Sequence, residues 1–199
     1  MQAPTPENCF YMSSSTMCIP YRLWPHQTLW GAAYADNIKR ASFPEILQDD
    51  EALYNFLTEL EEYGLLVLHD IPRKRGQIEI LSEHVGFLKR THYGNTFSVE
   101  QKIDANNLAY TFSTLNLHVD FPYITYVPGV QVLHCISQTT GEGGDNLLVD
   151  AFNAAYQLQK LHPHKFEVLT RVPVDFKDKG YEPKVNYEFH TRNQEPVIK

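Results

Sequence analysis

The chain has 199 residues, of which 43% are hydrophobic and 13% are aromatic, so it can bury the core of a single globular domain. Its formal net charge of −7 argues against a surface that neutralises phosphate groups, and we expect no nucleic-acid partner. The sequence contains no apolar run near the roughly 20 residues that a membrane-spanning helix needs, so we expect no membrane partner.

The cysteines and the N-terminal residues indicate a compartment. Cys9, Cys18 and Cys135 are an odd set without the spacing of a zinc site or a disulfide framework, so we expect reduced thiols. The N-terminus lacks the basic and apolar regions of a secretory signal. Glu7, and the lack of an arginine before Arg22, argue against a mitochondrial transit peptide. We therefore expect a cytoplasmic protein, with mitochondria as the less favoured location.

Residues 1–46 are rich in proline, serine and scattered aromatic residues, so we expect an irregular N-terminal segment. The folded domain is expected to occupy residues 47–199. Its first helix is predicted to follow Asp49-Asp50, whose side chains can accept hydrogen bonds from free amides, and to end at Gly64. The apolar run at residues 65–68 predicts a buried strand.

A second amphipathic helix is predicted over about residues 76–89, with Ile80, Leu81, Val85 and Leu88 facing inward. Two helices that lead into strands are typical of an α+β fold. The fold class expected from the residues is therefore α+β.

Beyond Tyr93 the sequence changes to short strand-like stretches separated by turn signals such as Pro128-Gly129 and Gly143-Gly144. Asp150 is placed to cap a helix over about residues 151–161, which explains this carboxylate better than a catalytic role does. The predicted strands in this part cover residues 107–112, 130–137 and 146–149.

The triplet His118-Val119-Asp120 carries the sharpest chemical signal in the chain. In an extended segment, residues i and i+2 point to the same side, so the imidazole and the carboxylate converge. This arrangement suits two arms of the 2-His-1-carboxylate triad that binds iron(II) and leaves coordination positions open. Taken alone the triplet is a weak signal, because most such triplets lie on protein surfaces without a metal.

Several linked stretches, in one order and spacing, are more specific than the triplet. They include Ile-Asp-Ala-Asn-Asn at 103–107, His-Val-Asp-Phe-Pro at 118–122 and Gly-Gly-Asp-Asn-Leu-Leu-Val-Asp at 143–150. Together they resemble the gamma-butyrobetaine type of iron(II)- and 2-oxoglutarate-dependent dioxygenase, within the taurine-dioxygenase-like group. The resemblance extends from about Trp30 to the end of the chain and is strongest over residues 93–152.

The resemblance implies a fold, a reaction and a set of cofactors. The fold would be a partial double-stranded β-helix, jelly-roll-like, with preceding helices and with its C-terminal strands missing. The cofactor would be Fe(II), with 2-oxoglutarate and O₂ as cosubstrates and ascorbate as reductant. The full-length protein would hydroxylate gamma-butyrobetaine, a small quaternary-ammonium compound, to carnitine in carnitine biosynthesis. We also expect a homodimer in the full-length form.

The resemblance also implies roles for particular residues. His118 and Asp120 would bind the iron, and the third ligand, a histidine, is expected beyond the chain end. Leu133 and Asn146 would line the 2-oxoglutarate pocket. The residues implied to bind the substrate are Tyr93, Phe97, Asn107, Tyr110 and Phe121.

Within that set the aromatic faces of Tyr93, Phe97 and Tyr110 would surround the substrate cation, and the Asn107 amide would donate to the substrate carboxylate. Phe97 stands where the family usually has tryptophan, and Phe121 replaces a family tyrosine. The aromatic residues are equally typical of a packed core when each is taken alone.

Three functional readings stay open at the level of the sequence. The chain is the N-terminal and middle part of a dioxygenase catalytic domain, which we expect to be inactive as it stands. Alternatively it is a truncated, non-catalytic isoform that acts as a binding or interaction protein. The third reading is a related dioxygenase, for example of the trimethyllysine type, with another substrate.

Overall fold

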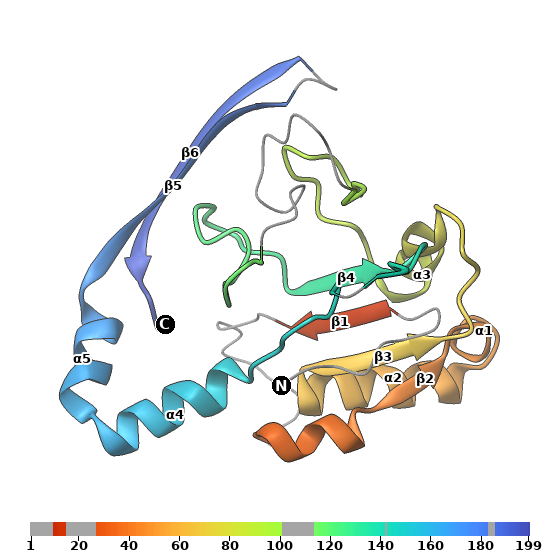
Figure 1. Ribbon diagram of the computed structural model, residues 1–199, viewed down its shortest axis with the longest axis horizontal. Helices are drawn as coiled ribbons and strands as arrows, with labels where there is room; N and C mark the ends of the chain where they lie inside the picture. Colours follow the sequence, from red (N-terminus) through yellow and green to blue (C-terminus); the bar gives the residue numbers. More distant parts are fainter. Residues whose placement is uncertain (1–9, 15–26, 101–113, 142, 183–185) are drawn as a thin grey trace.

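The computed structural model describes residues 10–14, 27–100, 114–141, 143–182 and 186–199 (Figure 1). The described elements, in chain order, are β1 (Phe10–Ser14), η1 (Ala32–Asn37), β2 (Arg40–Ser42), α1 (Phe43–Ile46), α2 (Asp50–Tyr63), β3 (Leu65–His69), α3 (Gln77–Val85), β4 (Val130–His134), α4 (Ala151–Leu161), α5 (Pro163–Arg171), β5 (Pro173–Glu182) and β6 (Tyr187–Pro196). Helices and strands are mixed, and the predicted α+β class is confirmed.

A four-stranded sheet in the order β2-β3-β1-β4 forms the centre of the fold. β2 pairs with β3 in parallel, whereas β1 runs antiparallel to both β3 and β4. β3 is therefore an interior strand. Its side chains alternate between two cores: Leu66 and Leu68 join one cluster, and Leu65 and Val67 join the other. Because both faces are covered, the strand is apolar at consecutive positions, as the run at residues 65–68 predicted.

The helix α2 covers one face of this sheet, below β3 in Figure 1. The Asp49 side chain accepts a hydrogen bond from the amide of Glu51, and Gly64 ends the helix in the left-handed conformation at φ 66°. Phe56 and Leu60 are the buried residues of the helix and pack in the same cluster as Leu66 and Leu68 of β3. The predicted end of this helix at Gly64 is confirmed, and the helix begins at Asp50, one residue earlier than predicted.

The next helix, α3, is shorter than the predicted helix over residues 76–89. It ends at Val85 because Gly86 follows in an extended conformation at φ 164°. Leu81 is buried as predicted, but Ile80 and Val85 are 38% and 42% exposed, so their inward orientation was wrong. The buried face instead includes Gln77, because the position of the sheet decides which side of a short helix is covered.

The expectation that residues 1–46 are irregular was wrong for the part that the structure describes, which contains β1, η1, β2 and α1. These elements owe their form to distant partners. In β1, for example, Phe10 pairs with Leu68 on one side and with His134 on the other. Such pairing leaves no local periodicity in the sequence. The division of the chain at residue 47 stays a prediction.

The C-terminal part continues from the sheet through α4 and α5 into the β5–β6 hairpin, which curves away from the sheet in Figure 1. α4 spans the predicted residues, and Asp150 caps it by accepting from the amide of Asn153 at 3.0 Å. The strand predicted at 130–137 is β4 and ends at His134, whereas residues 146–149 form no strand. The strand predicted at 107–112 lies outside the described residues. None of the described helices is long and apolar enough to cross a membrane.

Candidate active site

His118 and Asp120 lie in the irregular segment that precedes β4, and their side chains face each other. The Nε2 atom of His118 is 3.5 Å from Oδ1 of Asp120. The two side chains are 53% and 44% exposed, so water or a ligand can reach both atoms. The convergence that the spacing of the triplet predicted is present.

Each of the two side chains also has a second polar atom, Nδ1 of His118 and Oδ2 of Asp120, which forms a hydrogen bond with a neighbouring residue. The Nδ1 atom of His118 lies 2.6 Å from the carbonyl oxygen of Asn116. Because a carbonyl oxygen only accepts, Nδ1 carries the proton of this hydrogen bond, and a neutral imidazole then has its lone pair on Nε2. The Nε2 group of Gln131, on β4, donates to Oδ2 of Asp120 at 2.7 Å.

This donor set fits two positions of an iron(II) site. Metal-binding histidines usually donate their other ring N–H to a carbonyl or carboxylate, and metal-binding carboxylates are themselves hydrogen-bonded. His118 and Asp120 meet both conditions and leave Nε2 and Oδ1 directed at each other. Among the described residues, no group of three His, Cys, Asp or Glu side chains could hold a metal. The third ligand stays a prediction.

An aromatic cluster begins at Phe121, the residue after Asp120. Phe121 adopts φ 60°, a left-handed conformation that is uncommon for a bulky residue. Its ring centroid is 6.4 Å from that of Tyr93, and Tyr93 is 5.1 Å from Phe97. The structure thus brings together the three described members of the predicted substrate set. Asn107 and Tyr110 lie outside the described residues.

The cluster has further members that sequence reasoning missed. His92 lies against Tyr93, with ring centroids 4.0 Å apart, and against Phe189 of β6, at 4.2 Å. Tyr123 adds a ring 5.7 Å from Phe121. His92 is next to Tyr93 in the sequence, and Tyr123 is two positions after Phe121. This proximity to predicted residues was the one sequence signal that could have indicated them. Nothing local in the sequence connects Phe189 to this site.

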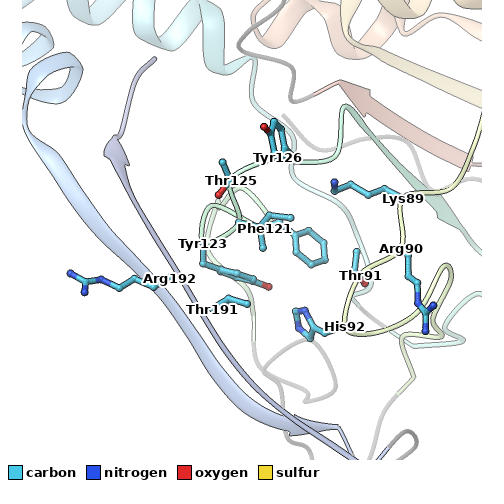
Figure 2. A pocket seen from close by; sticks show the side chains of 11 residues that line it. Lys89, Arg90, Thr91, His92, Phe121, Tyr123, Thr125, Tyr126, Thr191 and Arg192 are labelled. Atoms are coloured by element: carbon cyan, nitrogen blue, oxygen red, sulfur yellow. The ribbon is translucent and has the colours of Figure 1, made fainter.

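Beside the cluster is an open cavity of about 580 Å³. It is lined by residues 89–92, 121, 123–126 and 191–192, so three distant segments contribute to its wall. Figure 2 shows the side chains of His92, Phe121 and Tyr123 grouped around this space. Arg192 points away from it, toward Asp175, whose Oδ1 is 2.6 Å from Nε of the guanidinium.

The pKa of Tyr123, in this wall, is shifted by its surroundings. Burial, followed by the charge of the neighbouring Asp178 carboxylate and a hydrogen bond to it, raises the pKa of Tyr123 well above that of a free phenol. The Tyr123 hydroxyl therefore stays protonated and neutral at physiological pH. It can donate a hydrogen bond and presents no anion to the cavity.

The two residues predicted to line a 2-oxoglutarate pocket are both among the described residues. Leu133 is on β4 and is 39% exposed, and Asn146 is half-buried in the segment before α4. Among the described interactions, neither belongs to the aromatic cluster or to the hydrogen bonds of His118 and Asp120. Their assignment stays a prediction.

Comparison with known proteins places this site in a family. Residues 24–199 match the family described as taurine catabolism dioxygenase TauD, TfdA family. The chain is 36% identical to gamma-butyrobetaine dioxygenase of Homo sapiens over 96% of its own length and 48% of that protein. It is 38% identical to gamma-butyrobetaine dioxygenase of Pongo abelii, over 88% of this chain and 44% of that protein.

A third relative, trimethyllysine dioxygenase, mitochondrial, of Bos taurus, is 32% identical over 73% of this chain and 35% of that protein. The chain thus spans about half the length, or less, of these curated relatives. The family match covers most of the chain and includes every residue of the site described above. The chain therefore belongs to the TauD/TfdA family of dioxygenases.

Proposed function

We propose that this chain is part of an Fe(II)- and 2-oxoglutarate-dependent dioxygenase that hydroxylates gamma-butyrobetaine to carnitine. The observation that carries the proposal is the pairing of His118 and Asp120, each with its second atom hydrogen-bonded, next to an aromatic cluster. The names of the human and Pongo abelii relatives support the choice of substrate. The fold we propose for the complete domain is a double-stranded β-helix, as the family implies.

In this proposal Nε2 of His118 and Oδ1 of Asp120 hold the metal. Bound iron would supply the activation of O₂, with 2-oxoglutarate converted to succinate and CO₂ and one oxygen atom entering a substrate C–H bond. Gln131 and Asn116 keep the two ligand side chains oriented. Ascorbate would act as reductant, and a histidine outside this chain would complete the triad.

The aromatic cluster would bind the cationic end of the substrate. The ring faces of Tyr93, Phe97 and Phe121 attract a trimethylammonium group through their quadrupoles and exclude water from it. Tyr110 would add a further ring, and Asn107 would donate to the substrate carboxylate. Leu133 and Asn146 would contact 2-oxoglutarate. These roles rest on the resemblance to the family.

The proposal is tested with the full-length protein, supplied with iron(II), 2-oxoglutarate, ascorbate and O₂. We expect gamma-butyrobetaine to be hydroxylated with release of one succinate per product, and His118→Ala to abolish turnover. Loss of activity in His118→Ala with an unchanged circular dichroism spectrum would separate metal binding from folding. Turnover that survives this substitution would contradict the assignment of the ligand.

A second candidate substrate is trimethyllysine. It is favoured by the relatives named trimethyllysine dioxygenase and by Phe97 and Phe121, which stand where the family usually has other aromatic residues. Both candidates carry a trimethylammonium group, so the aromatic cluster suits either. A direct comparison of kcat/KM for the two compounds decides between them.

The chain by itself should bind without catalysing. Because no group of three metal-binding side chains is found among the described residues, we expect the isolated chain to release no succinate. Retained binding of a quaternary ammonium compound by this inactive chain would support the alternative of a non-catalytic binding protein. We further propose a homodimer for the full-length protein, which light scattering would test, and a cytoplasmic location.

A further inference from the structure

Three polar side chains from distant segments meet at the wall of the aromatic cluster. His92 follows α3, Tyr123 follows the His118–Asp120 pair, and Asp178 lies on β5. Nε2 of His92 is 3.5 Å from Oδ2 of Asp178, and these side chains are only 9% and 27% exposed. After burial, the charge of Asp178 is the main influence that raises the pKa of the neighbouring Tyr123 hydroxyl. Asp178, on the β5–β6 hairpin, therefore lies next to both His92 and Tyr123.

Aromatic packing surrounds this polar contact. The His92 ring has Tyr93 and Phe189 as close neighbours, at 4.0 Å and 4.2 Å, and Phe189 is 9% exposed. Gly180 pairs with Phe189 across the hairpin, and a Cβ at Gly180 would lie 2.7 Å from Cζ of the ring. The Phe189 ring therefore occupies the space that a side chain at position 180 would need. The glycine allows this ring to pack between the hairpin and the aromatic cluster.

The hairpin depends on these contacts for its place beside the site. Among the described residues, β5 and β6 pair with each other and not with the four-stranded sheet. A further link is the side chain of Asn193, which donates to the carbonyl oxygens of Pro122 and Ile124 at 3.1 Å and 3.4 Å. Figure 2 shows the hairpin, which carries Thr191, passing beside Tyr123 on the far side of the cavity from Lys89.

We propose that Asp178 is a positioning residue, which through His92 and Tyr123 holds the β5–β6 hairpin and the rings of Tyr93 and Phe121 as the walls of the substrate pocket. The inference rests on the proposed function, because it takes the aromatic cluster as the binding site for the cation. An ionised acceptor gives stronger and more directional hydrogen bonds than a neutral one. A carboxylate that lies against two side chains at once can therefore order two loops against one strand.

The test compares Asp178→Asn with Asp175→Asn in the full-length protein. Asp175 is on the same strand, but its carboxylate is bound to Lys177 and Arg192. For Asp178→Asn we expect the KM of the quaternary ammonium substrate to rise about tenfold, with kcat within about twofold of wild type. The dissociation constant for iron(II) should stay unchanged, and Asp175→Asn should behave as wild type.

A second readout is independent of turnover. With ¹³C-labelled tyrosine, the titration midpoint of Tyr123, assigned with Tyr123→Phe, should move toward that of a free phenol in Asp178→Asn, because a neighbouring negative charge is removed. It should not move in Asp175→Asn. If Asp178→Asn fails to fold, Tyr123→Phe removes the hydroxyl next to Asp178 and should raise KM by a smaller factor.

An unchanged KM in Asp178→Asn, an equal rise in Asp175→Asn, or an unmoved Tyr123 titration would each overturn the positioning role. If the wild-type protein turns over no quaternary ammonium compound, the proposed function fails. The positioning role is then decided by the titration of Tyr123 together with the dissociation constant of tetramethylammonium. A constant that is the same for wild type and Asp178→Asn overturns it, and one about tenfold higher in the variant supports it.

Discussion

Gln131 of β4 donates a hydrogen bond to Asp120, with 2.7 Å between Nε2 of the amide and Oδ2 of the carboxylate. The contact connects the sheet to the irregular segment that carries the proposed metal ligands. It also leaves the other oxygen, Oδ1, facing His118. No pattern in the sequence connects Gln131 with the triplet. In the structure, however, its side chain orients Asp120, one of the two proposed ligands.

Replacing Gln131 should therefore weaken metal binding in the full-length protein. Gln131→Leu removes the donor while keeping similar bulk, and we expect the affinity for iron(II) to fall about tenfold or more. Anaerobic titration of iron(II) measures this directly. Gln157→Leu is a matched control, since Gln157 donates a hydrogen bond to Asn153 on α4, away from the His118–Asp120 pair. An affinity equal to wild type in Gln131→Leu would contradict the orienting role.

Phe97→Trp should strengthen binding of the substrate cation. Tryptophan is the stronger cation–π partner, and Phe97 is 48% exposed, so we expect a gain of about 0.5 kcal/mol, or roughly twofold in affinity. Competition binding with gamma-butyrobetaine measures the gain. The neutral analogue in which carbon replaces the quaternary nitrogen serves as control. An equal gain for that analogue would attribute the effect to added contact area rather than to charge.

Gly180→Ala should destabilise the docked hairpin. The new Cβ would lie 2.7 Å from Cζ of Phe189, and that ring is packed on His92, so it has little room to move. We expect a loss of about 1–3 kcal/mol in the free energy of unfolding. Urea denaturation measures the loss. Gly141→Ala, where nothing lies within 4 Å of the added Cβ, should remain close to wild type.

Asp150→Ala should cost more stability than the loss of an ordinary helix cap. The carboxylate accepts from the amide of Asn153 at 3.0 Å and also from the amide of Trp30 at 2.9 Å. We expect a loss of about 2 kcal/mol, against about 0.5–1 kcal/mol for Asp49→Ala, whose carboxylate caps α2 alone. Equal losses in the two variants would show that the bond to Trp30 contributes nothing.

The raised pKa of Tyr123 predicts a loss of stability at alkaline pH. Above pH 10.0, the ordinary pKa of tyrosine, the unfolded chain loses this proton while the folded protein keeps it. The contribution of Tyr123 is therefore complete below about pH 10 and declines as the pH rises through the folded-state pKa. Thermal melts from pH 8 to 11 should show a smaller decline for Tyr123→Phe than for wild type. Tyr156→Phe, at a residue that is 56% exposed, should decline as wild type does.

The sequence by itself determined the features that depend on neighbours along the chain. Asp49 and Gly64 delimit α2, and Asp150 caps α4, because a capping side chain and a left-handed glycine act within one turn of helix. The spacing of His118 and Asp120 also predicted the convergence of their side chains. The family resemblance added Tyr93, Phe97 and Phe121, which the structure brings into one cluster.

Only the tertiary structure decided the rest. The pairing of β1 with β3 and β4, the buried face of α3 and the contact of His92 with Asp178 join residues far apart in sequence. Phe189 reaches the site because β6 pairs with β5 and so places this ring opposite Gly180. Contacts of this kind depend on how whole elements pack, and a linear pattern records only the preferences of each element. The sequence therefore predicted the proposed ligand pair, whereas the residues that surround it became visible only in the fold.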